Sequence, residues 1–246
     1  MTDQALCRFL EWDSDFFGVR VARAQVSRLA PDTASALLDW CRANAIDLLY
    51  FLADSDDPPT IRLAEDHGFR LVDLRVTLDR TLQVPAHAPQ YAVRTAQPGD
   101  LPALRAMARA GFRQSRFYAD PHIPAGRAGA LYEIWVEKRL NDPTSRVLVV
   151  DTDGEAAGFI TCLFDGADGA IDLFGVGEAA RGRGIGQALV QGALAWFGEQ
   201  GAQRASVVTQ GRNIAAQRLY QRCGFVTRAV QLWYHRWFAH DHPADS

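Results

Sequence analysis

A glycine-rich stretch directly ahead of an amphipathic segment is the feature that most constrains the fold of this chain. Residues 181–189 read RGRGIGQAL, with glycine at every second position from Gly182 to Gly186. Glycine inside a helix costs up to about 1 kcal/mol relative to alanine, so this composition is typical of a place where something approaches the backbone closely. The apolar run GAIDLFGV precedes the stretch, and apolar residues recur at helical spacing after it. The sequence therefore predicts a strand, a loop and a helix in direct succession.

The loop itself allows three interpretations. Glycine-rich turns often hold no ligand at all. A dinucleotide fingerprint of the G-x-G-x-x-A type is matched by FGVGEAA, but its helix would then run through Gly182, Gly184 and Gly186, and that context does not fit. The third interpretation is an anion cradle directly ahead of a helix at Gln187, where backbone N–H groups and the helix N-terminus attract a pyrophosphate. On these residues alone the first and third interpretations stay open.

The segments around the loop predict a mixed α/β domain. Upstream, Asp100 is expected to cap a helix with Leu104 and Ala108 on its apolar face. Valine, isoleucine and phenylalanine then recur in runs broken by DTDG and DGADG, which predict a three-stranded meander. After the helix over residues 187–200 we expect the strand RASVVTQ, the helix NIAAQRLYQRC and a final strand VQLWYHRWF.

Composition also divides the chain. Residues 83–90 lie in RTLQVPAHAPQYA, which has two prolines and no strand or helix period, and we expect a linker there. Residues 1–82 then form an N-terminal domain and residues 91–246 a larger second domain. The first repeats a fragment of the second: a helix, a strand, a helix ending in glycine and phenylalanine, and a strand. An internal duplication accounts for the repeat, and the first copy has no counterpart of RGRGIG.

The bulk composition excludes several classes of function. The chain of 246 residues has a net charge of -3, so it has no global basic field for nucleic acid or an anionic membrane. No segment reaches the roughly 18 apolar residues of a membrane span, and the N-terminus lacks the pattern of a signal peptide. The four cysteines are far apart, with no CxxC pair, as in reduced proteins. We therefore expect a cytoplasmic protein that binds neither nucleic acid nor membranes.

Two motifs resemble those of the GNAT acetyltransferase superfamily. Arg181, Gly184 and Gly186 match its acetyl-CoA motif R/Q-x-x-G-x-G/A, behind the strand LFGV. NIAAQRLYQRCGF, residues 213–225, matches its pattern N-x-x-A-x-x-L-Y-x-x-x-G-F. The motifs lie in the family's order, and the resemblance covers residues 91–238. It implies an α/β fold with a mixed, mainly antiparallel sheet flanked by helices, and a degenerate partial copy of that fold in the N-terminal half.

The resemblance also implies a cofactor site and a catalytic residue. It implies that acetyl-CoA, as co-substrate, binds along one strand, the glycine loop and the start of one helix, at Phe174, Gly175, Val176, Arg181, Gly182, Arg183, Gly184, Ile185, Gly186, Gln187, Asn213 and Ala216. It makes Tyr220 the general acid that protonates the leaving thiolate. Taken alone, Tyr220 lies on an apolar helix face with Leu219 and Cys223, where tyrosine is most often a core residue. The surrounding motif favours catalysis.

Three patches carry a narrower resemblance, to bacterial TDP-fucosamine acetyltransferases: LEWDSDFFGVRVAR, DLPALRAMARAGFRQSRFYADPHIP with LYEIWVEK, and VVTQGRNIAAQRLY with LWYHRWF. Those enzymes N-acetylate a nucleotide-linked 4-amino-4,6-dideoxygalactose. Arg116 with Phe117 or Tyr118 suits a diphosphate and a nucleobase, through charge-assisted hydrogen bonds and stacking. Trp135 is a candidate sugar platform, although the helical spacing within LYEIWVEK favours a core position. Gln210 faces either the acceptor or solvent.

We therefore expect an N-acetyltransferase that moves acetyl directly from acetyl-CoA to a small-molecule amine, with a nucleotide sugar as the first candidate. An antibiotic, a polyamine or a protein N-terminus is the alternative acceptor, and a non-catalytic acyl-CoA sensor is the alternative from another class. No metal is expected, because HDH near the C-terminus has no further ligands nearby. Asp165 and Asp172 are candidate bases, each also typical of a turn or strand end. The apolar LWYHRWF fits either a homodimer interface or a sheet edge covered within the chain.

Overall fold

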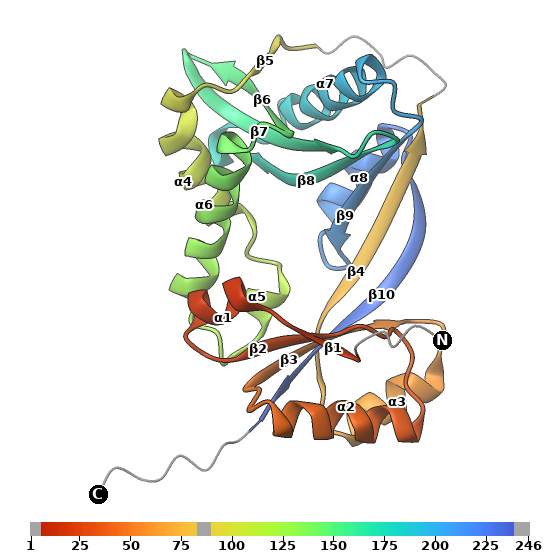
Figure 1. Ribbon diagram of the computed structural model, residues 1–246. Coiled ribbons are helices and arrows are strands. Elements are labelled where there is room, and N and C mark those ends of the chain that lie inside the picture. Colours follow the sequence, from red (N-terminus) through yellow and green to blue (C-terminus); the bar gives the residue numbers. More distant parts are fainter. Residues whose placement is uncertain (1–5, 83–89, 239–246) are drawn as a thin grey trace, which may run out of the picture. The chain divides into compact units, whose positions relative to one another are not determined.

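A computed structural model describes residues 6–82 and 90–238 of the chain (Figure 1). The chain forms two compact units: Met1–Arg75 with Val230–Ser246 make up unit 1, and Val76–Ala229 make up unit 2.

Two strands of 12 residues each, β4 (Arg70–Thr81) and β10 (Val226–Trp237), begin in one unit and end in the other. For this reason the compact units do not coincide residue by residue with the domains predicted on either side of residues 83–90. The predicted linker itself lies outside the described residues, except for Gln90, and it stays a prediction.

Unit 1 is a mixed sheet with helices. Its strands follow the order β1, β2, β3 and β10, with β2 parallel to β3 and the other two pairs antiparallel. Every residue of β3 from Leu48 to Ala53 is buried, as expected of a strand covered on both faces. The elements before β4 are β1 (Cys7–Phe9), α1 (Glu11–Phe17), β2 (Val21–Ala24), α2 (Pro31–Ala43), β3 (Leu48–Asp54) and α3 (Pro58–Asp66).

The apolar final segment of the chain belongs to this sheet. Residues 231–237 of β10 pair with β3, and Tyr234 lies opposite Phe51 in that pairing. Leu232 and Tyr234 are part of the buried core of unit 1. Burial within the chain thus accounts for these side chains of LWYHRWF without a second copy, and the homodimer stays a prediction.

Two helix ends, one in each unit, have the same local structure. α3 and α8 (Ile214–Arg222) are both followed closely by a glycine of positive φ, 77° at Gly68 and 83° at Gly224. In both, the N–H of the next phenylalanine bonds to the carbonyl five residues back, at 2.9 Å in unit 1 and 3.0 Å in unit 2. Glycine adopts such φ values without strain and commonly ends helices in this way. The helices α2 and α7 end with the same kind of bond, from Ile46 N to Cys41 O and from Ala202 N to Phe197 O, so this geometry is common in the chain and the internal duplication stays a prediction.

Unit 2 contains the remaining strands, in the order β4, β9, β8, β7, β6 and β5. Neighbours from β5 to β8 are antiparallel, whereas β8 and β9 run parallel. The mixed, mainly antiparallel sheet flanked by helices confirms the predicted fold class. The elements after β4 are β5 (Val93–Thr95), α4 (Leu101–Gly111), α5 (Arg116–Ala119), α6 (Ala125–Asn141), β6 (Ser145–Thr152), β7 (Glu155–Phe164), β8 (Asp168–Val176), α7 (Ile185–Glu199), β9 (Arg204–Gln210) and α8.

Helices cover both faces of β6, β7 and β8 (Figure 1). α4 and α6 contact these strands on one side, and α7 contacts them on the other. Ile160 and Cys162 of β7 share a core with Leu189 and Phe197 of α7, as the helical spacing predicted. Because side chains alternate along a strand, residues of β7 next to Ile160 and Cys162 in the sequence point to the opposite face of the sheet.

One predicted helix cap is wrong. Asp100 precedes α4, but its side chain does not bond to the first turn of that helix. Its carboxylate instead accepts the Gln97 N–H at 2.7 Å and pairs with Arg94 at 2.8 Å. Arg94 also pairs with Asp151 at 2.6 Å, and its guanidinium holds the pKa of Asp100 below the ordinary value. The ion-pair network, which sequence position does not reveal, takes the carboxylate away from the helix.

Within residues 6–82 and 90–238, no helix has the length and apolar character needed to cross a membrane. The four cysteines are free and buried, which agrees with a chain that does not depend on disulfides.

Gly169 tests the packing of α7 on the sheet. A Cβ atom at Gly169 of β8 would lie 2.4 Å from Cδ1 of Phe197, which is fully buried. We expect Gly169→Ala to lower the free energy of unfolding by about 1–3 kcal/mol through overpacking, as measured by urea denaturation. Gly198→Ala is the matched control, because its Cβ would meet nothing within 4 Å and alanine favours a helix. Equal stability of Gly169→Ala and the wild type would contradict the described packing.

Candidate functional site

The site lies where two neighbouring strands stop pairing. The last pair between β8 and β9 joins Ile171 to Val207. β8 nevertheless continues to Val176 and β9 to Gln210. Backbone groups of β8 beyond Ile171 therefore have no sheet partner on the β9 side among the described residues, and they are available to something else.

A register shift between β7 and β8 precedes this opening. The pairing slips between Ile160 and Cys162 of β7. The intervening Thr161 is fully buried, and its hydroxyl oxygen accepts the Leu173 N–H at 2.8 Å. A side chain thus satisfies a group that the ladder leaves unpaired. Bulges of this kind disrupt the ladder and are common next to active sites.

Two backbone N–H groups of β8 point away from β7. Gly177 N donates to Ala157 O of β7 at 2.9 Å. Because N–H direction alternates along a strand, the N–H groups of Phe174 and Val176 face the opposite edge. The Val176 carbonyl faces that edge as well, where it accepts a bond from Arg181 Nε at 3.3 Å. This edge can pair with the polar groups of an extended ligand.

The glycine loop follows β8 and leads directly into α7. Gly182 and Gly184 have φ angles of 75° and 86°, which glycine adopts without strain. The first helical bond runs from Ala188 N to Gly184 O at 3.1 Å, so the N–H groups of residues 185–187 have no acceptor within the helix. Together with the helix dipole they favour an anion. The helix begins at Ile185, slightly earlier than predicted.

A cavity of about 540 Å³ lies between β8, the glycine loop and α8. All residues predicted to bind acetyl-CoA line it except Arg183: Phe174, Gly175, Val176, Arg181, Gly182, Gly184, Ile185, Gly186, Gln187, Asn213 and Ala216. The carbonyl of Arg183 accepts the Tyr91 hydroxyl at 2.8 Å. The fold therefore gathers two motifs that are separate in the sequence around one space.

The cavity is also lined by residues that were not predicted to bind acetyl-CoA: Gly111, Gln114, Ala180, Ala215, Leu219 and Arg222. Three of them lie on α8 at spacings of four and three residues, which places them on one helix face. The helical period could have indicated these three. Gly111 and Gln114 lie at and just after the end of α4, and only the tertiary fold brings them here.

Asn213 has a clear local role at this site. Its side-chain oxygen accepts the Ala216 N–H at 3.2 Å, which caps α8. The cap fixes the start of α8 at the cavity wall, because both residues line the cavity.

Tyr220 is buried next to the cavity and is not part of its lining. Its ring lies edge-on to Phe174, a lining residue, with centroids 6.2 Å apart, and to Phe225, with centroids 5.7 Å apart. Burial raises the pKa of the Tyr220 hydroxyl. The phenol therefore stays protonated over the whole neutral range, which a proton donor requires.

The predicted acceptor residues do not line this cavity. Phe117 and Trp135 pack edge-on with centroids 6.0 Å apart, and the burial of Phe117 makes this pair part of the contact between α5 and α6. The Arg116 guanidinium lies 4.3 Å from the Phe117 ring centroid. The Tyr118 hydroxyl donates to a carbonyl of α4 at 3.4 Å. Gln210 is half-buried, and its carbonyl accepts a side-chain amide of α8 at 3.1 Å.

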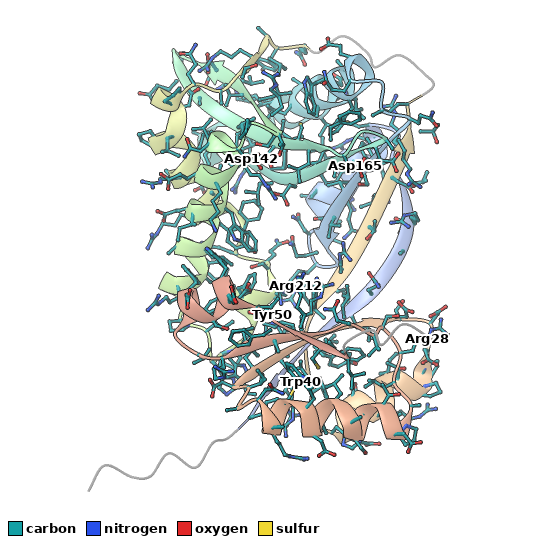
Figure 2. All side chains as sticks on the ribbon, viewed as in Figure 1. Arg28, Trp40, Tyr50, Asp142, Asp165 and Arg212 are labelled. Atoms are coloured by element: carbon teal, nitrogen blue, oxygen red, sulfur yellow. The ribbon has the colours of Figure 1, made fainter. Side chains whose placement is uncertain are left out.

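Both candidate bases already have partners. Asp172 pairs with Arg139 at 2.6 Å. Asp165 lies in the turn between β7 and β8 (Figure 2), where it accepts the N–H groups of Asp168 at 2.8 Å and Ala167 at 3.0 Å. These bonds lower the pKa of Asp165. Both acids thus have structural partners, and the lowered pKa makes Asp165 a weaker base.

Other reactive groups add little to the site. Burial raises the pKa of the Cys162 and Cys223 thiols, so neither ionises readily to a nucleophile. In the described part of the chain, no group of three or more histidine, cysteine or acidic side chains is placed to hold a metal ion. His240 and His242 of the HDH segment lie outside the described residues.

Comparison with known proteins agrees with this geometry. The model of the acetyltransferase (GNAT) family matches residues 99–225. A dTDP-fucosamine acetyltransferase of Escherichia coli O6:H1 is 30% identical over 231 residues, which cover 92% of this chain and 96% of that protein. A spore coat polysaccharide biosynthesis protein of Bacillus subtilis is 28% identical over 149 residues. That match covers 61% of this chain and about half, 52%, of the relative.

Solved structures share the fold. A GCN5-related N-acetyltransferase from Sphaerobacter thermophilus superposes with a TM-score of 0.67 at 20% sequence identity. The superposition covers 94% of this chain and 76% of that one. At this identity the similarity is one of fold, and it extends over both units of the present chain.

The burial of Tyr220 predicts a pH effect on stability. Because its pKa is raised in the folded state, the Tyr220 contribution is fully present below the unfolded pKa, near 10, and is lost as the pH rises above it. We expect the free energy of unfolding to fall above about pH 10 more steeply in the wild type than in Tyr220→Phe, by up to about 1.4 kcal/mol per pH unit. Urea denaturation at a series of pH values measures this difference. Identical slopes in the two proteins would show that the hydroxyl is solvated.

Proposed function

The chain belongs to the GNAT family of acetyltransferases, and on that premise we propose that it moves the acetyl group of acetyl-CoA to the amine of a nucleotide-linked amino sugar, such as TDP-4-amino-4,6-dideoxygalactose. The observation that supports acetyl-CoA as the acetyl donor is the cavity, which is lined by the end of β8, the glycine loop and α8. The nucleotide-linked amino sugar as acceptor is supported by the similarity to a dTDP-fucosamine acetyltransferase over most of both chains.

The residues around the cavity fit acetyl-CoA chemically. Its pantetheine arm is a chain of amides, which pairs with the free edge of β8 at Phe174 and Val176 as an added strand would. Its pyrophosphate is an anion that suits the N–H groups of residues 185–187 and the Arg181 guanidinium. Gly186 lets the start of α7 lie close to β8 and α8, since a Cβ there would lie 3.1 Å from Cζ of Phe174 and 3.2 Å from Cδ2 of Leu219.

In this proposal the acetyl group passes directly between the two substrates. The amine nitrogen attacks the thioester carbon, the C–N bond forms, and the C–S bond then breaks to release CoA as a thiolate. The N–H of Val176 stabilises the oxyanion that forms on the carbonyl. Tyr220 donates the proton that the sulfur takes up. No acyl-cysteine is needed, in keeping with the inert thiols of Cys162 and Cys223.

The acceptor approaches from the α4 end of the cavity. Gln114 lines that end, and Arg116 follows it by two residues at the start of α5. A guanidinium there suits the diphosphate of a nucleotide sugar, and Tyr118 offers a ring for the base. Phe117 and Trp135 support this segment by packing. In the proposal water takes the proton of the attacking amine, because a sugar amine is less basic than lysine and both candidate acids are held by structural partners.

Thiol release from acetyl-CoA tests the reaction, the acceptor and the acid together. With TDP-4-amino-4,6-dideoxygalactose we expect turnover that Tyr220→Phe slows by about 10²- to 10⁴-fold in kcat, while acetyl-CoA binding changes little. Tyr132→Phe, another buried tyrosine of unit 2, serves as the matched control and keeps wild-type turnover. Release with a polyamine or an aminoglycoside in place of the nucleotide sugar would contradict the acceptor. Full turnover by Tyr220→Phe would contradict the general acid.

A further inference from the structure

A second cavity, of about 490 Å³, adjoins the first in unit 2. Both are lined by Gln187, in the first turn of α7, and by Arg222, in the last turn of α8. Because they share these residues, the cavities are neighbours, and a ligand seated on the glycine loop can extend past Arg222. The proposed function does not by itself assign a role to this extension.

The second cavity carries two guanidinium groups. Arg222 is exposed, and its side chain forms no ion pair within the described part of the chain. Arg80 of β4 donates to Cys223 O at 2.6 Å, which satisfies a carbonyl at the end of α8. The N–H groups of the Arg222 guanidinium are therefore available to a ligand. Arg80 contributes a second positive charge to the cavity lining.

One acidic residue, Asp79, also lines this cavity, but its charge does not offset those of Arg80 and Arg222. Asp79 pairs with Arg228 at 3.2 Å and is largely withdrawn from solvent. The other polar side chains that line the cavity are the neutral amides of Gln187 and Gln191, beside Thr81. The cavity therefore has a positive balance and suits an anion with several acceptor oxygens.

Acetyl-CoA has such a group beyond its pyrophosphate. The adenosine end carries a 3′-phosphate, and a phosphate monoester of this kind has a charge of about −1.5 to −2 near pH 7. With the thioester at Phe174 to Val176 and the pyrophosphate at residues 185–187, the adenosine end follows on the side of Gln187 and Arg222. On the basis of the proposed function, we propose that Arg222, supported by Arg80, binds the 3′-phosphate and makes the enzyme select CoA over carriers that lack this group.

The test is a binding experiment that needs no acceptor. Isothermal titration compares CoA with 3′-dephospho-CoA for the wild type, Arg222→Gln and Arg218→Gln. Arg218 is the matched control, because it is exposed on the same helix and lines neither cavity. We expect the wild type and Arg218→Gln to bind CoA about 5-fold or more tightly than dephospho-CoA, as for a partly exposed charge-assisted contact. Arg222→Gln removes that preference by weakening CoA alone.

Two results would overturn the inference, and they differ from a failure of the proposed function. An equal loss of both ligands in Arg222→Gln would assign Arg222 to the pyrophosphate instead. A CoA preference that survives in Arg222→Gln would place the 3′-phosphate elsewhere. In both cases the protein still binds CoA, and the proposed function stands. If the wild type binds neither compound, the donor site and this inference fall together.

Discussion

The bulge between β7 and β8 is the feature on which the rest of the site depends. Thr161 supplies a hydroxyl acceptor for the Leu173 N–H at 2.8 Å, so the ladder can slip without leaving a buried polar group unpaired. β8 then leaves its pairing with β9 after Ile171. Backbone groups that a regular sheet would use internally stay available, and the side chains of the motifs gather around them.

The positive character of the site comes mostly from the backbone. The chain has a net charge of -3, so no general attraction draws an anion to it. Positive φ values at Gly182 and Gly184 instead turn the chain so that α7 starts directly after the loop and directs unpaired N–H groups outward. Arg181 and Arg222 line the same cavity and add side-chain charge. Composition therefore gives no sign of an anion site, whereas the glycine spacing predicts one.

The long elements were predictable because their apolar residues repeat with the period of the structure. The strands β6 to β9 and the helices α7 and α8 fall in the segments predicted for them. The short elements β1, β2, β5 and α5 have three or four residues each, too few to show a period. Interactions between distant segments could not be predicted from the sequence either, as in the pairing of Arg94 with Asp100 and Asp151.

In the candidate site, too, residues within local patterns could be predicted from the sequence, whereas residues brought together only by the tertiary fold could not. The two motifs and the strand before the glycine loop predicted 11 of the 17 residues that line the cavity, because each is a short local pattern. Gln114 was missed because it lies in the segment between α4 and α5, far from both motifs in the sequence, and Arg222 because its role depends on the neighbouring cavity. For Tyr220 the helical pattern predicted burial, which is confirmed, while the motif predicted catalysis, which stays a prediction. Burial keeps the phenol protonated at neutral pH, but by raising the pKa it also makes the phenol a weaker acid.

Hydrogen–deuterium exchange with and without acetyl-CoA tests the central claim most directly, because that claim concerns backbone N–H groups of one strand end and one helix start. The account predicts slower exchange on binding in peptides that cover residues 172–188 and 213–222, with exchange unchanged in residues 31–66 of unit 1. Saturable binding without protection of residues 172–188, or with protection confined to unit 1, would contradict it.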